Sequence, residues 1–388
     1  MLGLILAGGG ARGAYEAGVL RFVFTTLAKR HGIDPNPDLI SGTSVGALNG
    51  AWVGARGAEG ASQLWEFWQH VTIDQVYNFS ATDFLRRPSR WLERTTEFGE
   101  GVGIFDPTPL YRLIRASVPW AALHDRIDRR ELRAFMVSAT DVASGRTRIF
   151  TDGDVRLRRA ATCTPTATRI GPEHCLASAA IPFVFPGIRI NGRYFVDGAL
   201  RQNTPLSPAV EAGVNRALVI GVKRLKGEED APNSSPTPAF LAGKALNALL
   251  LDPIEENIRR IDALNDLMVW GQSAYPDFMA RLNAEFKPYQ IVKHVFLRPS
   301  EDLGRMAAHI FAKTKDDLPW AVSRLLGSIA GGADQQEADL MSYLFFDHRF
   351  TATMEELGYQ DAAREEEQLV RLFTPPPRDA SSDVLPSR

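Results

Sequence analysis

The sequence is poor in several features that each define a class of protein. Its 388 residues include only two cysteines, Cys163 and Cys175, without the CxxC spacing of a zinc or redox site, so no disulfide framework is expected. No apolar run approaches the roughly 20 residues that span a bilayer. The net charge of −2, from 44 basic and 46 acidic residues, gives no general attraction to nucleic acid. What remains is ordinary globular composition.

The first residues of the chain bear on its location. Residues 1–7 are apolar but lack the basic residues that open a signal peptide, and they run directly into glycines. We therefore expect a cytoplasmic protein with two buried thiols.

The first fifty or so residues predict a strand, a helix, a second strand and a second helix. Residues 2–6 form a compact apolar run that stops at three glycines, and residues 15–27 carry apolar side chains at helical spacing. Residues 38–40 form the second strand by context. Residues 47–55 predict a helix with small residues on one side, which lets it lie close to a sheet. This order implies a βαβ unit with a right-handed crossover.

The rest of the chain supplies further strands and then mainly helices. The strands are expected over residues 135–140, 146–151, 189–196, 217–222 and 290–297. Asn191 and Gly192 are expected to form a tight turn inside residues 189–196, and residues 290–297 are expected to return to the sheet. We expect a core over residues 1–226, a loop or linker over 227–238, a mainly helical C-terminal region over 239–373 that packs on the core, and a disordered tail over 374–388.

Three glycines at GxGxxG spacing, Gly8, Gly10 and Gly13, follow the first predicted strand and open the first predicted helix. A dinucleotide fingerprint has this context, and Asp34 lies about twenty residues on, where that motif places an acidic residue. The same backbone N–H groups can instead hold the oxyanion of an acyl-transfer intermediate. A tight packing turn is a third interpretation. The loop alone leaves an NAD or FAD site, an oxyanion loop and a structural turn open.

A second motif, Gly42-Thr43-Ser44-Val45-Gly46, is a GxSxG sequence between a predicted strand and a small-residue helix. That is the setting of a nucleophile elbow, in which the serine sits on a sharp turn at a helix start. The glycines two residues before and after it avoid clashes with the neighbouring strand and helix. A plain Gly-Ser turn is the structural alternative.

A serine nucleophile needs a base, and none of the seven histidines has a recognisable catalytic context. A histidine triad assembled in space remains open, because such triads have no fixed sequence position. Asp197 is the better candidate, since it ends a predicted strand and is followed by Gly198 and Ala199. An Asx turn or a helix N-cap is the alternative role for this aspartate.

Three ordered motifs carry a family resemblance: GGGARG over residues 8–13, GTSVG over residues 42–46 and DGA over residues 197–199. Together they resemble the patatin-like phospholipases. The stretch from residue 177 to residue 206, which begins ASAAIP and ends NTPL, resembles that family's approach to its aspartate. The resemblance covers about residues 2–225.

The resemblance implies a fold and a chemistry. The fold would be an α/β three-layer sandwich around a mainly parallel central sheet, here with a largely helical C-terminal region. Ser44 would be the nucleophile and Asp197 the general base of a Ser-Asp dyad, and Gly9 and Gly10 would match the oxyanion loop. Ala199 stands where many relatives carry glycine. The resemblance implies lipid or other carboxylic esters as substrates, and no metal or cofactor.

Two further features concern the setting of this chemistry. Arg12 would either add positive potential near the glycine loop or lie on the helix surface, paired to a carboxylate. Residues 79–98 interleave aromatic side chains such as Phe84 and Trp91 with arginines, which suits a lid or helix at a membrane surface, although a solvated loop is the simpler interpretation.

The sequence thus predicts a serine acyl hydrolase with peripheral membrane contact as a candidate property. An NAD or FAD oxidoreductase and a catalytically silent scaffold are its alternatives, and the oligomeric state stays undetermined.

Overall fold

The computed structural model describes residues 1–77, 93–96, 99–103, 105–159, 163–224, 254–286, 289–318, 320–329 and 338–374. The expected linker over residues 227–238 and the expected tail beyond residue 374 lie outside these ranges. The aromatic and basic segment over residues 79–98 also lies outside them, except for the short strand β3 (Glu93–Thr96), which pairs with β4 (Gly99–Val102).

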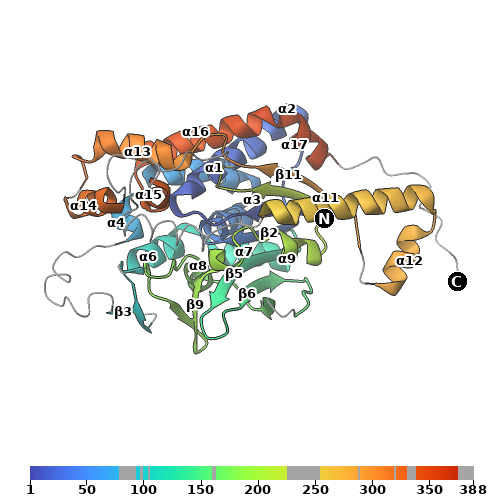
Figure 1. Ribbon diagram of the computed structural model, residues 1–388, viewed down its shortest axis with the longest axis horizontal. Helices are drawn as coiled ribbons and strands as arrows, with labels where there is room; N and C mark the ends of the chain where they lie inside the picture. The colour runs from blue at the N-terminus through green and yellow to red at the C-terminus, as the bar shows by residue number, and fades with distance from the viewer. Residues whose placement is uncertain are drawn as a thin grey trace, which may run out of the picture.

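A twisted sheet, with nine strands in the described part of the chain, forms the centre of the fold (Figure 1). Its order is β11-β10-β1-β2-β5-β6-β7, with β9 paired to β5 and β8 paired to β9. The first five strands in this order are parallel, and β6 runs antiparallel to β5. The strands are β1 (Leu2–Leu6), β2 (Leu39–Thr43), β5 (Ala134–Asp141), β6 (Thr147–Gly153), β7 (Cys163–Ala167), β8 (Ile188–Ile190), β9 (Arg193–Asp197), β10 (Arg216–Ile220) and β11 (Lys293–Leu297).

The predicted α/β fold with a mainly parallel sheet is confirmed. The expected return of residues 290–297 to the sheet is also confirmed, because β11 pairs in parallel with β10. The tight turn expected at Asn191 and Gly192 is confirmed: both residues take positive φ angles, 48° and 79°, and reverse the chain, so residues 189–196 form a hairpin of two strands.

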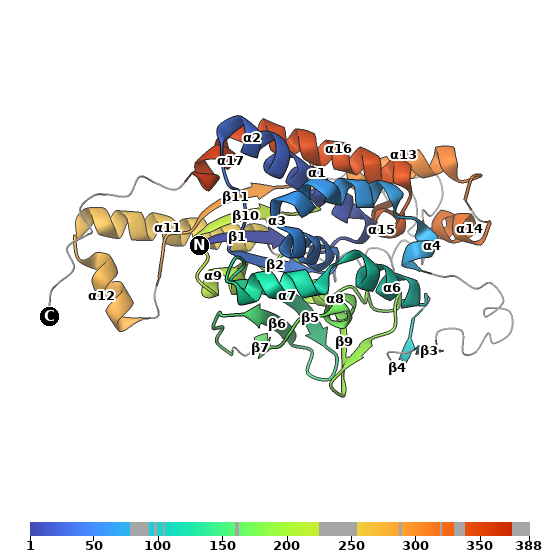
Figure 2. The ribbon, with the colours of Figure 1, turned by 180° about the vertical axis from the view of Figure 1, so that it is seen from behind.

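Helices cover both faces of the sheet and give it three layers. Alternate strand residues point to opposite faces, so Leu4 and Leu6 of β1 join one hydrophobic core while Ile5 joins the other. The larger core includes residues of α1, α3, α7, α8 and α16, and the smaller core includes residues of α9 and α11. Figure 1 views the sheet from the side of α11, and Figure 2 from the side of α7.

The helices of the first 224 residues are η1 (Gly10–Arg12), α1 (Gly13–Arg21), the π-helical η2 (Phe22–Leu27), α2 (Ala28–His31), α3 (Val45–His70), α4 (Ile73–Val76), α6 (Thr108–Ser117), α7 (Trp120–Asp128), α8 (Pro172–Ser178), η3 (Gly198–Leu200) and α9 (Leu206–Glu211). Later helices are α11 (Ile254–Ala274), α12 (Phe278–Glu285), α13 (Leu303–Thr314), α14 (Trp320–Ile329), α15 (Ala338–Leu344), α16 (His348–Arg364) and α17 (Glu366–Phe373). Within the described residues, none of them is long and apolar enough to cross a membrane.

The first helical run matches its sequence prediction. α1, η2 and α2 continue one another from residue 13 to residue 31, and the run ends at Gly32, whose φ of 62° is the left-handed conformation of a helix C-terminus. The apolar positions predicted to face the core, Tyr15, Val19, Phe22, Val23 and Leu27, are all buried.

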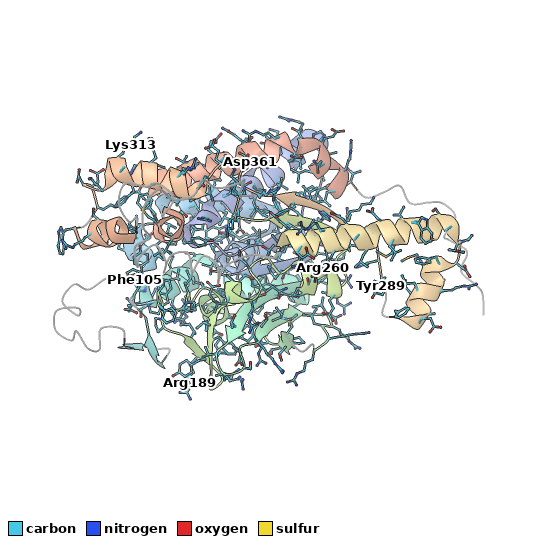
Figure 3. All side chains as sticks on the ribbon, in the orientation of Figure 1. Phe105, Arg189, Arg260, Tyr289, Lys313 and Asp361 are labelled. Carbon is cyan, nitrogen blue, oxygen red and sulfur yellow. The ribbon has the colours of Figure 1, made fainter. Side chains whose placement is uncertain are left out.

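The C-terminal helix α16 packs directly on α1 at two glycines. A side chain at Gly18 would collide with the carbonyl oxygen of Glu355, and one at Gly358 with the carbonyl oxygen of Tyr15. Tyr15 also donates a hydrogen bond of 3.1 Å to Asp361, on α16 above α1 in Figure 3. The two backbones therefore approach more closely than any side chain larger than hydrogen would allow.

This close approach can be tested by adding one methyl group. Gly18→Ala should lower the free energy of unfolding by about 2–3 kcal/mol, because the colliding atom belongs to backbone that cannot rotate away. The matched control is Gly327→Ala in α14, where the new methyl meets nothing closer than Phe311 at 3.9 Å. The control should leave stability unchanged or raise it by up to about 1 kcal/mol. Urea denaturation that finds both variants equally stable would contradict the close packing of α1 and α16.

Candidate active site

The two glycine motifs lie side by side at one edge of the sheet. β1 and β2 are parallel neighbours, with Leu6 opposite Gly42, so both chains leave the sheet at their carboxyl ends. The glycine loop (residues 8–13) follows β1, and Ser44 follows β2. A β-carbon placed on Gly8 would lie 3.1 Å from the β-carbon of Ser44. The loop is therefore close to the serine.

Ser44 adopts the strained backbone of a nucleophile elbow. Its φ of 54° and ψ of −123° lie outside the regions usual for a non-glycine residue. A side chain at Gly42 would collide with the carbonyl oxygen of Gly46. A β-carbon at Gly46 would lie 2.5 and 2.6 Å from the carbonyl oxygens of Leu6 and Ala7. Both glycines of the motif are thus required for α3 to begin directly against the end of β1.

A second serine holds the elbow in place. The backbone N–H of Ser44 donates to the hydroxyl oxygen of Ser178 at 2.7 Å, and that hydroxyl donates to the carbonyl oxygen of Ser138 at 2.6 Å. Ser178 thus links the elbow to β5. Ser178 lies within the ASAAIP stretch that contributes to the family resemblance, and no local pattern in the sequence predicts its role.

Asp197 ends β9 and contacts Ser44. Its carboxyl lies near the Ser44 hydroxyl, which acts to lower its pKa, and accepts a hydrogen bond of 2.8 Å from the backbone N–H of Ala199. The bond from Ala199 caps the short helix η3, so the N-cap role considered from sequence and the proximity to Ser44 coexist. Gly198 is required here, because a side chain on it would collide with the carbonyl oxygen of Ser138.

The environment of Asp197 makes it a stronger base than a free aspartate. The residue is 1% exposed. Burial raises the pKa of its carboxyl to about 7, although the hydrogen bond from the Ala199 amide and the nearby Ser44 hydroxyl oppose part of the rise. A carboxylate with a pKa near neutrality is suited to take a proton and return it.

Gly10 and Arg12 of the glycine loop contact the C-terminal region. Gly10 has a φ of 56°, and a side chain on it would collide with the carbonyl oxygen of Tyr343. The Arg12 guanidinium carbon lies 4.1 Å from the centre of the Tyr343 ring, and Nε and Nη2 donate to the Ser342 hydroxyl at 2.8 and 2.6 Å. Arg12 is 2% exposed, so the interpretation of a helix-surface arginine is wrong.

Asn49, five residues after Ser44 on α3, is the centre of a buried hydrogen-bond network. Its amide nitrogen donates to the Gly13 carbonyl oxygen at 3.0 Å and to Glu16 at 2.8 Å, and its amide oxygen accepts from the Trp68 indole at 3.0 Å. Burial raises the pKa of Glu16 to about 8. The network connects the end of the glycine loop to both halves of α3.

The alternative assignments made from sequence fit this geometry poorly. Asp34, the candidate acidic residue of a dinucleotide site, accepts hydrogen bonds from Asn36 just before β2 begins. It lies at the edge of the sheet opposite the glycine loop, whereas such ligands bind at the carboxyl ends of the strands. None of the seven histidines lines the pocket at Ser44. Among the described residues, no group of three or more His, Cys, Asp or Glu side chains is arranged to hold a metal ion.

An apolar pocket opens beside Ser44. It is lined by Gly10 and Ser44, by side chains of α3, α4, α6 and the stretch after α8, and by Tyr343, Leu344 and Phe346 of the C-terminal region. Its empty space is about 780 Å³ when the open side is included. The sequence did not predict that the C-terminal region contributes to this pocket.

Comparison with known proteins defines the class. The patatin-like phospholipase family matches residues 4–210, more than half of the 388 residues, and the chain belongs to that family. Among solved structures, the chain is similar to VipD from Legionella pneumophila, with 14% identity and a TM-score of 0.40. That similarity covers 94% of this chain, which spans 66% of the length of VipD.

The raised pKa of Asp197 predicts a pH-dependent effect on stability. Between about pH 4, where an unfolded aspartate titrates, and about pH 7, the folded protein binds more protons at this site than the unfolded chain. Stability contributed by the group therefore falls as pH rises through this window. Asp197→Asn removes this loss of stability with rising pH, because the amide does not titrate. The melting temperature of Asp197→Asn minus that of the wild type should therefore increase from pH 4.5 to pH 7.5.

The control for this measurement is Asp141→Asn. A hydrogen bond from Arg193 is the main cause that holds the pKa of Asp141 below its usual range, so its carboxylate stabilises the fold above about pH 4. Asp141→Asn should lower the melting temperature at pH 7.5 and have less effect as the pH falls toward 4. If the melting temperature of Asp197→Asn relative to the wild type also fell with rising pH, as expected for Asp141→Asn, an elevated pKa at Asp197 would be excluded.

Proposed function

We propose that the protein is a serine acyl hydrolase that cleaves carboxylic esters of lipids through a Ser44-Asp197 dyad. The observation that carries the proposal is the proximity of a serine on a strained elbow to a buried aspartate whose pKa is about 7. The apolar pocket that Ser44 lines suits an acyl chain, and the family supports lipid esters as the substrate class.

The proposed reaction has two halves. Ser44 Oγ attacks the ester carbonyl carbon while its proton passes to Asp197, and backbone N–H groups of Gly9 and Gly10 stabilise the oxyanion. The alcohol leaves with the proton from Asp197, and the acyl group remains bonded to Ser44. Water then attacks this acyl-enzyme, giving its proton to Asp197, and the fatty acid departs as Ser44 regains a proton.

The reaction would take place where lipid substrates are found. Transient contact with a membrane surface by an otherwise cytoplasmic protein is therefore part of the proposal. A dinucleotide-dependent oxidoreductase is disfavoured, because the candidate acidic residue, Asp34, lies at the opposite edge of the sheet.

Substitution of the dyad provides the direct kinetic test. Ser44→Ala should lower kcat for a carboxylic ester by about 10⁴-fold or more, and Asp197→Asn should lower it by about 10³-fold or more, with both variants folded. The matched control is Ser62→Ala, a serine on α3 that bonds to the Glu59 carbonyl oxygen outside the pocket; its kcat should match the wild type. Ser44→Ala with near wild-type kcat would remove Ser44 as the nucleophile.

The pH profile identifies the base. Because the deprotonated form of Asp197 accepts the proton, kcat/KM should rise with pH and reach half its maximum near pH 7. The residual activity of Asp197→Asn should lack this rise. A half-maximum near pH 4, or the same rise persisting in Asp197→Asn, would assign the base to another group.

A further inference from the structure

The pocket follows one face of α3 away from the candidate nucleophile. Ser44, Leu48 and Trp52 all line it, at successive intervals of four residues, which places them above one another on a helix. Eight residues at helical rise separate Ser44 from Trp52 by about 12 Å. The pocket is thus elongated, with Ser44 near one end and Trp52 toward the other.

Two more helical segments form part of its walls. α3 is kinked at Gly57, where φ is 64°, and its second half folds back along the first: the Trp68 indole bonds to Asn49, and the Trp52 indole bonds to the Gly60 carbonyl oxygen at 2.8 Å. α6 forms a third wall, with Leu110 and Ser117 among the lining residues. The result is an elongated apolar tube, whose walls also include α4, the stretch after α8 and residues 343–346.

Arg56, one turn beyond Trp52 on α3, packs against the indole from outside the pocket lining. The Arg56 guanidinium carbon lies 3.9 Å from the centre of the Trp52 ring, and its Nη2 donates to the Ser117 carbonyl oxygen at 3.1 Å. Trp52 also packs on Phe67, with ring centres 5.1 Å apart. Arg56 therefore holds the Trp52 indole in place and joins α3 to the end of α6.

We propose that Trp52, held by Arg56, sets the maximum length of the acyl chain that this pocket accepts. The inference rests on the proposed function, since the chain is that of the acyl group bonded to Ser44. An extended chain advances roughly 1.2 Å per bond, so about 12 Å accommodates an acyl group of about ten carbons. Trp52, Ser117 and Arg56 are all partly exposed, so removing the indole opens the tube toward solvent and gives longer chains an exit.

The test compares p-nitrophenyl esters with acyl groups of four, ten and sixteen carbons. The wild type should prefer the ten-carbon ester. Trp52→Ala should raise kcat/KM for the sixteen-carbon ester relative to the ten-carbon ester by about tenfold or more, the discrimination that a hydrophobic pocket achieves over a few carbons. Trp52→Phe, which keeps an aromatic ring over Arg56, should retain the wild-type preference.

A second variant tests the same tube without removing the end residue. Leu48 lies about halfway between Ser44 and Trp52, so Leu48→Trp should shift the preference from the ten-carbon to the four-carbon ester by about tenfold. The matched control is Trp65→Ala: Trp65 lies on α3 but outside the pocket, with the Arg21 guanidinium 5.6 Å from its ring centre. The control should leave the chain-length profile unchanged.

A binding measurement separates this inference from the proposed reaction. Calorimetry on Ser44→Ala should show tighter binding of decanoate than of hexadecanoate, and adding Trp52→Ala should reverse the order. Hydrolysis that persists with the same chain-length profile in Trp52→Ala and Leu48→Trp would overturn the role of Trp52 and leave the hydrolase intact. Absence of hydrolysis by the wild type, with the binding order still reversed, would overturn the proposed reaction and leave the length limit standing.

Discussion

The site depends on one steric constraint, the contact of Gly46 with the carbonyl oxygens at the end of β1. α3 begins directly against that strand: a β-carbon placed on Gly46 would lie only 2.5 Å from the Leu6 carbonyl oxygen. Because of this close approach, the chain must turn sharply at Ser44. The turn forces the left-handed φ of 54° and brings the serine beside the glycine loop. The hydrogen bond from the Ser44 amide to the Ser178 hydroxyl offsets the backbone strain. The elbow is thus held by this hydrogen bond and by the contact at Gly46.

The C-terminal helices contact the glycine loop and line the pocket of this site. Tyr343 contacts Gly10 of the glycine loop and stacks on Arg12, and Leu344 accepts a hydrogen bond of 2.8 Å from Tyr77 while lining the pocket. α16 in turn packs on α1 through glycines. The same contacts that stabilise the fold therefore shape the pocket, and loosening them would alter both.

Much of the fold and the proposed dyad could be predicted from local sequence. The glycine loop, the elbow and Asp197 each occupy a short segment whose residue types fix its backbone. Compact apolar runs indicate strands of the sheet, and apolar residues at helical spacing indicate α1. The remaining parts are contacts between distant segments: Ser178 is 134 positions from Ser44, and Ser342 is 330 positions from Arg12. No local pattern encodes these pairings. The pocket wall at Tyr343 and the kink at Gly57 were missed for this reason.

The most direct measurement is the site of covalent labelling by an alkyl fluorophosphonate, which reacts with an activated serine. Proteolysis and mass spectrometry should locate a single adduct, on Ser44. Labelling should fall strongly in Asp197→Asn, because the aspartate accepts the serine proton. An adduct on a different serine, or complete absence of an adduct on a folded wild-type protein, would contradict the assignment of Ser44 as the nucleophile.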